Sequence, residues 1–279
     1  MKNILFPTDF SDCAANALEH ACRIALHFRS SITLLHVYPI PIAASDVPTE
    51  LIIASQFKED AEKGMAAIKA HAVQAYPTLS FQTIITAGDA SSEISYYLKE
   101  NPCDIVIMGT SGASGLKRLA VGSTATHVIQ HAHIPVMVIP SHRHYQEIKH
   151  IVISSSFNLN EVEYIKNVYE WYKAFNCKLS LLRIDDVTTF QDDVTAEQVE
   201  AFMLKVKQAL NGVEPSVVVV SGTDVPHSII DFVRHSQVDL LVTVHQHRSF
   251  IAQLIFPSIS KDIAFHPPAP LLIFIRYKK

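Results

Sequence analysis

The sequence predicts an α/β fold that is built twice: two tandem domains, each an open five-stranded parallel sheet with helices on both faces. Three observations support this prediction. Short apolar runs alternate with amphipathic helices, the second half of the chain repeats motifs of the first at constant offsets, and 48% of the 279 residues are apolar. Buried strands separated by helices are typical of parallel sheets covered on both faces, and this apolar content is ample for packed cores.

Apolar runs and helical periodicity place the elements of the first half. The opening run Ile4-Leu5-Phe6 indicates a buried strand, and residues 12–28 carry an apolar stripe at helical spacing. A proline-bearing loop separates the second strand from the second helix. In chain order we expect strand 2–7, helix 12–28, strand 31–38, helix 57–75, strand 80–87, helix 92–100, strand 105–109, helix 123–131 and strand 135–139.

The second half repeats this plan. Segment 4–11 aligns with segment 151–158 at an offset of 147, and Asp104 aligns with Asp239 at an offset of 135. The difference of 12 between the two offsets is explained mainly by a shorter loop after the second strand of the second copy. Because each offset holds over a long stretch of sequence, we interpret the chain as a tandem duplication.

This duplication sets the expected domain organisation. We expect a first domain over residues 1–140, a polar linker over 141–149 and a second, degenerate domain over 150–279.

Composition excludes several classes of function. A net charge of −4 argues against a nucleic-acid binder, which needs clustered lysine and arginine. No apolar run reaches the roughly 18 residues that span a bilayer, so no membrane partner is expected. The start of the chain lacks the pattern of a signal peptide, and the four cysteines form no CxxC pair. Unpaired cysteines of this kind are typical of reduced thiols, so we expect a cytoplasmic protein.

Half of the chain's eight glycines lie in one window of fourteen residues, 109–122. An apolar run of strand length, Asp104 to Met108, precedes the window, and an amphipathic helix that opens with Ser123 and Thr124 follows it. A buried strand, a glycine-rich loop and a helix N-terminus together present main-chain N–H groups to an anion, usually a phosphate. A tight strand-to-helix connection without a ligand is the alternative.

The spacing Gly109-x2-Gly112-x9-Gly122-Ser123 resembles the ATP-binding signature of the universal stress protein family. The apolar strands on both sides of the signature and the opening segment 4–11 agree with this resemblance, which extends over the whole chain as a tandem protein. It implies an adenine-nucleotide α-hydrolase-like fold and ATP as the ligand, with Mg²⁺ as an optional companion. Because the family dimerises by pairing its last strands, the resemblance also implies that residues 136–139 and 271–275 pair within one chain and form an intrachain pseudo-dimer. A homodimer is a further alternative.

The resemblance also implies roles for individual residues. Asp9, at the end of the first strand, would face the ribose and the phosphate–metal region, although a turn residue or helix cap is the alternative. Val37 would meet the adenine edge, and the glycine window would hold the phosphates. The candidate nucleotide-binding residues are Pro7, Thr8, Asp9, Val37, Met108, Gly109, Gly112, Gly115, Gly122, Ser123 and Thr124.

The second copy has lost this signature. Proline and β-branched valine cannot reproduce a loop that needs glycine's conformational freedom, and proline also lacks an N–H donor. We therefore expect no ATP in the second domain. His245-x-His247 is too small a set for a zinc site, so no metal is predicted there. The aligned replacements are Gly109 by Val244, Gly112 by His247, Gly122 by Pro257 and Asp9 by Ser156, whereas Ser123 is matched by Ser258.

No set of residues points to fast catalysis. The G-x-S-x-G elbow and the Walker pattern are both absent from the sequence, so the chain is expected to be no enzyme, or to hydrolyse ATP slowly at most. We predict a cytosolic stress-response protein that binds ATP in its first domain and acts as a nucleotide-dependent switch or scaffold towards unidentified protein partners. The alternative is a nucleotide-free interaction scaffold.

Overall fold

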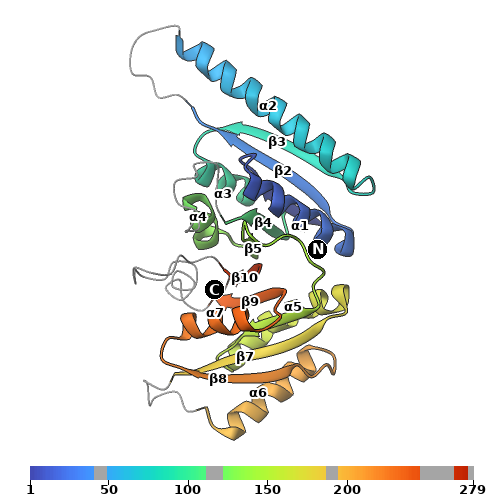
Figure 1. Cartoon of the computed structure of the whole chain (residues 1–279), viewed down its shortest axis with the longest axis vertical. Helices are drawn as coiled ribbons and strands as arrows, with labels where there is room; N and C mark the ends of the chain where they lie inside the picture. The colour runs from blue at the N-terminus through green and yellow to red at the C-terminus, as the bar shows by residue number, and fades with distance from the viewer. Residues whose placement is uncertain (41–48, 111–121, 187–193, 246–266, 276–279) are drawn as a thin grey trace. The chain divides into compact units, whose positions relative to one another are not determined.

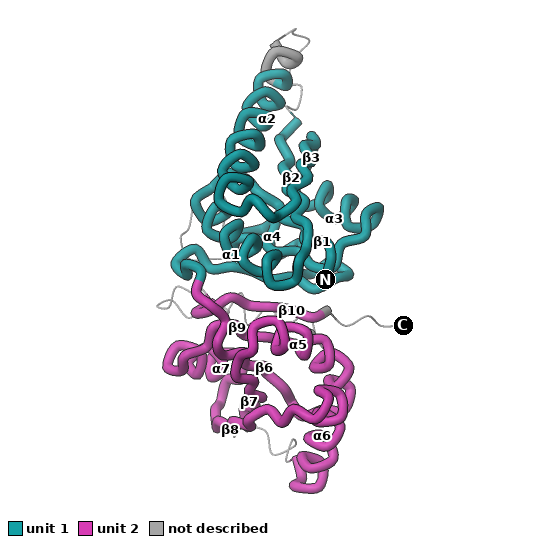
Figure 2. Tube along the Cα trace, turned by 90° about the vertical axis from the view of Figure 1, so that its right-hand side faces the viewer, with its two compact units in different colours: residues 1–145 teal, residues 146–279 magenta. Residues whose placement is uncertain are grey.

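The computed structural model describes residues 1–40, 49–110, 122–186, 194–245 and 267–275. The chain divides into two compact units, Met1–Tyr145 and Gln146–Lys279, which Figure 2 shows in separate colours. This division falls inside the predicted linker, 141–149. Among the described helices, none has the length and apolar character that a bilayer-spanning segment requires.

Unit 1 is an α/β unit whose described strands are all parallel. The strand order is β3-β2-β1-β4-β5, and helices lie on both faces of the sheet (Figure 1). The direction of winding reverses between β1 and β4. Its elements are β1 (Asn3–Pro7), α1 (Asp12–Phe28), β2 (Ser31–Tyr38), α2 (Thr49–Ala75), β3 (Phe81–Ala87), α3 (Ala90–Glu100), β4 (Ile105–Gly109), α4 (Ser123–His131) and β5 (Val136–Ile139).

Unit 2 has the same strand order in its own numbering. The described strands follow the order β10-β9-β6-β7-β8 and are again parallel. The predicted fold class, an α/β parallel sheet in each of two tandem copies, is therefore confirmed. The elements are β6 (His150–Ser154), the 3₁₀ turn η1 (Leu159–Glu161), α5 (Val162–Phe175), β7 (Lys178–Asp186), α6 (Ala196–Ala209), β8 (Ser216–Gly222), α7 (Val225–His235), β9 (Leu240–His245) and β10 (Leu271–Ile275).

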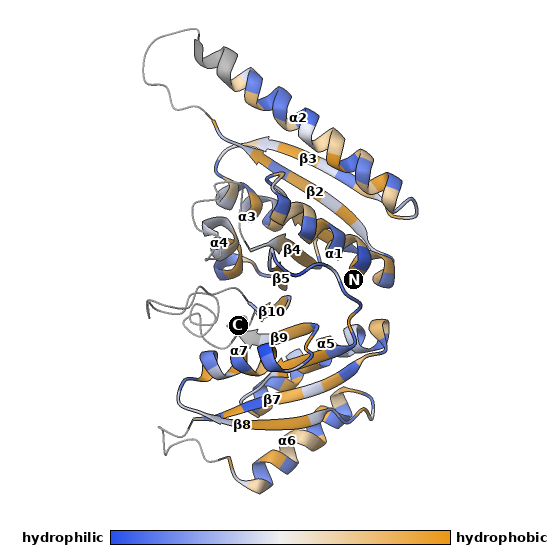
Figure 3. Ribbon diagram, in the orientation of Figure 1, coloured by the Kyte–Doolittle hydropathy of each residue, from blue (hydrophilic) through white to orange (hydrophobic). Residues whose placement is uncertain are grey.

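The central strands form the core of each unit. Ile4, Leu5 and Phe6 of β1 are fully buried, as are Ile151 and Val152 of β6. Neighbouring residues of a strand point to opposite faces, so consecutive buried residues show that helices cover both faces of these strands. Figure 3 shows where hydrophobic and hydrophilic residues lie along the strands and helices of each unit.

The duplication extends to backbone conformation and hydrogen bonds. Phe10 and Phe157, which align at the offset of 147, both adopt a left-handed backbone, with φ of 64° and 61°. Asp104 accepts two hydrogen bonds from the main chain at the start of β1, and Asp239 accepts the same two at the start of β6. The two copies are thus built with the same turns.

One helix begins earlier than the sequence pattern predicts. α2 starts at Thr49, eight residues before the expected Phe57. Proline disfavours a helix before it but not after it, and Pro48 is the last proline of the preceding segment. The helix can therefore begin immediately after Pro48. Most other predicted boundaries in unit 1 agree within two residues, and α1, β2, β4 and α4 agree without a shift.

Candidate functional site

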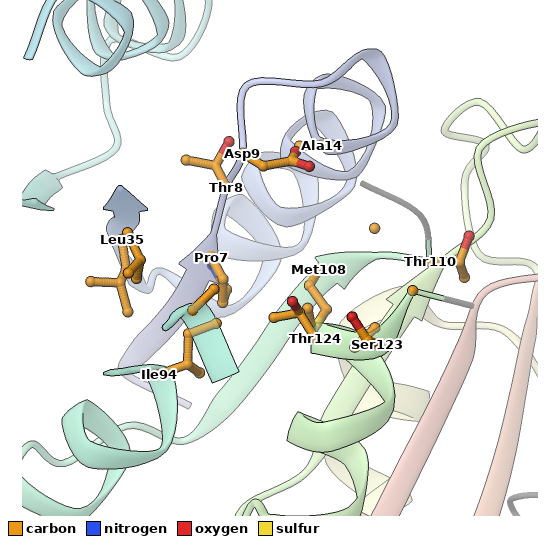
Figure 4. A pocket seen from close by; sticks show the side chains of 15 residues that line it. Pro7, Thr8, Asp9, Ala14, Leu35, Ile94, Met108, Thr110, Ser123 and Thr124 are labelled. Atoms are coloured by element: carbon orange, nitrogen blue, oxygen red, sulfur yellow. The ribbon is translucent and has the colours of Figure 1, made fainter. Parts of the chain in front are cut away.

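A cavity of about 260 Å³ lies in unit 1 at the carboxyl ends of β1, β2 and β4. The winding of the sheet reverses between β1 and β4, and ligands of open parallel sheets bind at this kind of position. Figure 4 shows side chains from three strands and from the starts of α1, α3 and α4 around it. Its lining residues are Pro7, Thr8, Asp9, Ala14, Leu35, Val37, Ala90, Ile94, Met108, Gly109, Thr110, Gly122, Ser123, Thr124 and Ala125.

Nine of the eleven residues that the sequence proposes for nucleotide binding line this one cavity. The other two, Gly112 and Gly115, lie outside the described residues. Six other lining residues were not predicted from the sequence, although the sequence pattern could have indicated two of them. Leu35 precedes Val37 by two positions on the same strand face, and Thr110 follows Gly109 directly. The missed residues are Ala14, Leu35, Ala90, Ile94, Thr110 and Ala125.

One wall of the cavity is apolar. Leu35 from β2, Ile94 from α3 and Met108 from β4 are all buried, with exposed fractions of 1%, 2% and 6%. Val37 and Ala90 line the same cavity. Buried apolar side chains of this kind suit the flat face of an aromatic ring system.

The N-terminus of α4 contributes polar residues, Ser123 and Thr124, to the same cavity. The N-cap residue, Gly122, supplies no side-chain hydrogen bond to the first turn, and no acidic residue occurs in that turn. The other two helices that begin at this cavity are capped, α1 by Ser11 and α3 by Asp89. Gly122 thus provides no side-chain acceptor for the first N–H groups of α4, and together with the positive end of the helix dipole this makes the helix start suitable for an anion.

Asp9 combines a turn contact with a place in the lining. Its Oδ1 accepts hydrogen bonds from the Ser11 N–H, at 3.1 Å, and from the Ser11 hydroxyl, at 2.6 Å. The Ser11 hydroxyl in turn accepts from the N–H of Ala14, at 3.2 Å, which caps α1. Asp9 itself is exposed. The turn orients the carboxylate at the cavity and leaves it accessible to solvent.

Gly109 has a packing requirement besides its place in the cavity. A Cβ atom at this position would lie 2.7 Å from Sγ of Cys13 and 3.2 Å from the main-chain oxygen of Cys13. The first turn of α1 therefore packs directly on the end of β4. This close approach explains a glycine here without reference to a ligand.

Replacing Gly109 by alanine should destabilise unit 1 by about 1–3 kcal/mol, because the added methyl group overpacks this contact. Native-state hydrogen exchange of the β4 amides measures the loss. In a Cys13→Ala background, which removes Sγ, part of the lost stability should return. An unchanged exchange rate in the single variant would contradict this packing argument.

Unit 2 carries a buried carboxylate at the matching strand end. Glu161 aligns with Ala14, and its side chain accepts hydrogen bonds from the Ser155 hydroxyl, the Ser156 hydroxyl and the Ser156 N–H. Glu161 is only 5% exposed. Unit 2 therefore has a carboxylate at the sequence position where unit 1 has Ala14, whose methyl group lines the cavity, and it has Ser156 in place of Asp9.

A second replacement changes the polar contacts beside this carboxylate. Arg183 of β7 aligns with His36 of β2. Its Nη1 donates to the main-chain oxygen of Ser156, at 2.6 Å, and its Nε donates to Asp185. The guanidinium also lies over the ring of Phe157, where unit 1 stacks His36 on the aligned phenylalanine. The end of β6 is thus filled by an internal polar network.

The loop that follows β9 cannot be compared with the glycine window in the structure. Val244, which aligns with Gly109, belongs to β9, whereas His247, Pro257 and Ser258 lie outside the described residues. Within the described ranges, no three histidine, cysteine, aspartate or glutamate side chains come together as metal ligands would.

Comparison with known proteins identifies one protein family to which this chain is similar. The model of the universal stress protein family matches residues 1–140 and 165–274. A universal stress protein of Methanocaldococcus jannaschii is 30% identical over 141 residues, which are 50% of this chain and 81% of that protein. One of Bacillus subtilis is 27% identical over 147 residues, which are 50% of this chain and 98% of that protein.

A solved structure supports the fold over the whole chain. The crystal structure of a universal stress protein from Archaeoglobus fulgidus has a TM-score of 0.72 and covers 99% of this chain and 98% of its own, at 17% sequence identity. At that identity the likeness shows the fold alone. Because the family model matches most of the chain in two segments, this protein belongs to the universal stress protein family as a tandem member.

Proposed function

We propose that unit 1 binds ATP, together with Mg²⁺, in the cavity at the ends of β1, β2 and β4. The observation that carries this proposal is the start of α4, whose N-cap is a glycine and whose first residues line a cavity that also has an apolar wall. A nucleotide joins an anionic phosphate group, which suits the start of α4, to an aromatic base, which suits the apolar wall. Family membership and the glycine spacing of the sequence support the same ligand.

Different residues of the cavity would contact different parts of the nucleotide. Val37 and the apolar side chains around it would contact the adenine, and Gly122, Ser123 and Thr124 would contact the phosphates. Asp9 is the exposed carboxylate of the cavity and would bind the ribose or the metal ion. Mg²⁺, when bound, supplies positive charge that offsets the phosphates. The cavity is slightly smaller than the about 300–1,000 Å³ of typical ligand pockets, so part of the nucleotide would extend from it.

Unit 2 is proposed to bind no nucleotide in this manner. The carboxylate of Glu161 lies at the matching strand end and would repel a phosphate there. One ATP per chain is therefore expected. Unit 2 would instead act as a partner domain, and pairing of its last strand with that of unit 1 stays a prediction.

The proposed role is a cytoplasmic nucleotide-dependent switch. ATP bound at the start of α4 would change a surface that a partner protein recognises. Among the described residues that line the cavity, no general base lies beside an activated nucleophile, and the proposed role accordingly requires binding and at most slow hydrolysis.

Isothermal titration calorimetry of the dialysed full-length chain with Mg-ATP tests the proposal. We expect a saturable heat with a stoichiometry of one nucleotide per chain. Mass spectrometry of gently purified protein should also detect a co-purifying adenine nucleotide. The absence of any saturable heat at millimolar nucleotide would contradict the proposal and favour the nucleotide-free scaffold.

A further inference from the structure

Strand β8 is an edge of the sheet of unit 2. It pairs with β7 in a parallel register and, among the described strands, with no other. One side of an edge strand presents a row of main-chain N–H and C=O groups that another strand can use. The partner that this geometry selects is therefore an extended polypeptide.

The side chains of β8 lack the features that usually protect such an edge. Residues 216–221 read Ser-Val-Val-Val-Val-Ser, without charge or proline, whereas natural edge strands commonly carry lysine, proline or a bulge. Val217 and Val219 are 41% and 52% exposed. In Figure 3 this strand is hydrophobic along its length.

The helix cover differs between the two copies and explains this exposure. In unit 1 the 27-residue α2 packs on β2 and on the edge strand β3, and Figure 1 shows it lying along them. The corresponding helix of unit 2, α6, has only 14 residues and packs mainly against α5. The length difference between the two copies therefore lies mainly in this helix, and the expectation of a shorter loop before it is wrong. The face of β8 that carries Val217 and Val219 is consequently left partly uncovered.

The exposed pattern is complementary to itself. Val217 and Val219 lie on one face of β8, because side chains alternate along a strand. Two antiparallel copies of β8 related by a twofold axis through Val218 would place Val217 of each copy directly opposite Val219 of the partner subunit. Four exposed valines would then cover one another on the same face.

The charges beside this face do not oppose such pairing. Val219 is in register with Arg183 of β7, and Ser221 is in register with Asp185. Arg183 and Asp185 form an ion pair with each other, at 2.6 Å. The nearest charges on the adjacent strand are thus compensated within each copy, and no charge of β8 itself would meet its equivalent across the axis.

We propose that β8 is a self-association surface, through which two copies of this chain join their sheets by antiparallel β8 pairing. A twofold interface requires one surface that is complementary to itself, and the alternation of Val217 and Val219 around Val218 meets this requirement. The proposal concerns unit 2 alone and does not depend on nucleotide binding.

Sedimentation velocity of the full-length chain at several concentrations tests this interface. We expect the wild-type chain to form a dimer and Val219→Lys to raise the dimer dissociation constant by about tenfold or more, since lysine blocks edge pairing. Leu204→Lys on α6 is the matched control, because Leu204 is an equally exposed apolar residue of unit 2, at 56%. This control should dimerise like the wild type.

Two results would overturn the proposal: a wild-type chain that stays monomeric at all concentrations, or a Val219→Lys dimer as stable as that of the wild type. A monomeric wild type that pairs with an extended peptide would assign the edge to another partner and also reject self-association. Circular dichroism checks that each variant is folded. If Val219→Lys fails to fold, Val217→Lys provides the same test at the facing position.

Discussion

Replacing Ser123 by aspartate should lower the affinity of unit 1 for ATP by about 100-fold, a loss of roughly 2.7 kcal/mol. Ser123 is the first residue of α4 and lines the cavity. A carboxylate there would lie beside the proposed phosphates, and two like charges about 4 Å apart near a protein surface repel by up to about 4 kcal/mol. The helix itself should tolerate the change, because an acidic residue in the first turn stabilises a helix.

Ser123→Asn is the matched control for this variant. Asparagine has the size and shape of aspartate without its charge, so it should reduce ATP affinity by less than about fivefold. Calorimetry measures both affinities, and circular dichroism checks that the helix content is unchanged. If the Ser123→Asp and Ser123→Asn variants bind ATP with equal affinity, the phosphates do not lie at the start of α4.

Replacing Glu161 by alanine should destabilise unit 2 by about 2–4 kcal/mol. The variant removes the acceptor of the Ser156 N–H and of two serine hydroxyls at a site where Glu161 is 5% exposed. Buried donors that lose their acceptor retain the desolvation cost without the compensating hydrogen bond. The end of β6 should therefore become the weakest part of the unit.

The chain offers a selective probe for this measurement. Trp171 is its only tryptophan and is a buried residue of α5 in unit 2. Urea unfolding followed by tryptophan fluorescence therefore reports on unit 2. The exposed Glu163 of α5 provides the control, since Glu163→Ala should change stability by less than about 0.5 kcal/mol. If Glu161→Ala lowered the free energy of unfolding as little as Glu163→Ala does, the Glu161 network would contribute nothing to stability.

Much of the fold could be predicted from the sequence because local patterns agree with the tertiary structure. The run Ile4-Leu5-Phe6 is too apolar for any place except a strand covered on both sides, and the stripe of α1 fixes the face that packs on the sheet. The start of α2 could not be predicted in this way. Its first turns carry no clear apolar stripe, and the prolines before it suggested a longer loop than the structure has.

The candidate site was predicted in part, for a different reason. Resemblance to a family motif identified strand ends and a glycine window, and the sheet then brought nine of those residues to one cavity. Contacts that depend on helix placement could not be anticipated. Nothing in the sequence shows that Ala14 faces the cavity or that the aligned Glu161 bonds to Ser155 and Ser156, because both facts follow from where a helix meets a strand end.

A crystal structure of the full-length chain with Mg-ATP would show where the nucleotide binds. We expect one nucleotide per chain in unit 1, with its phosphates against the main chain of Gly122, Ser123 and Thr124 and its base beside Val37. The end of β6, where Glu161 lies, should hold no nucleotide. A nucleotide bound at the end of β6, or one whose phosphates lie away from the start of α4, would contradict this expectation.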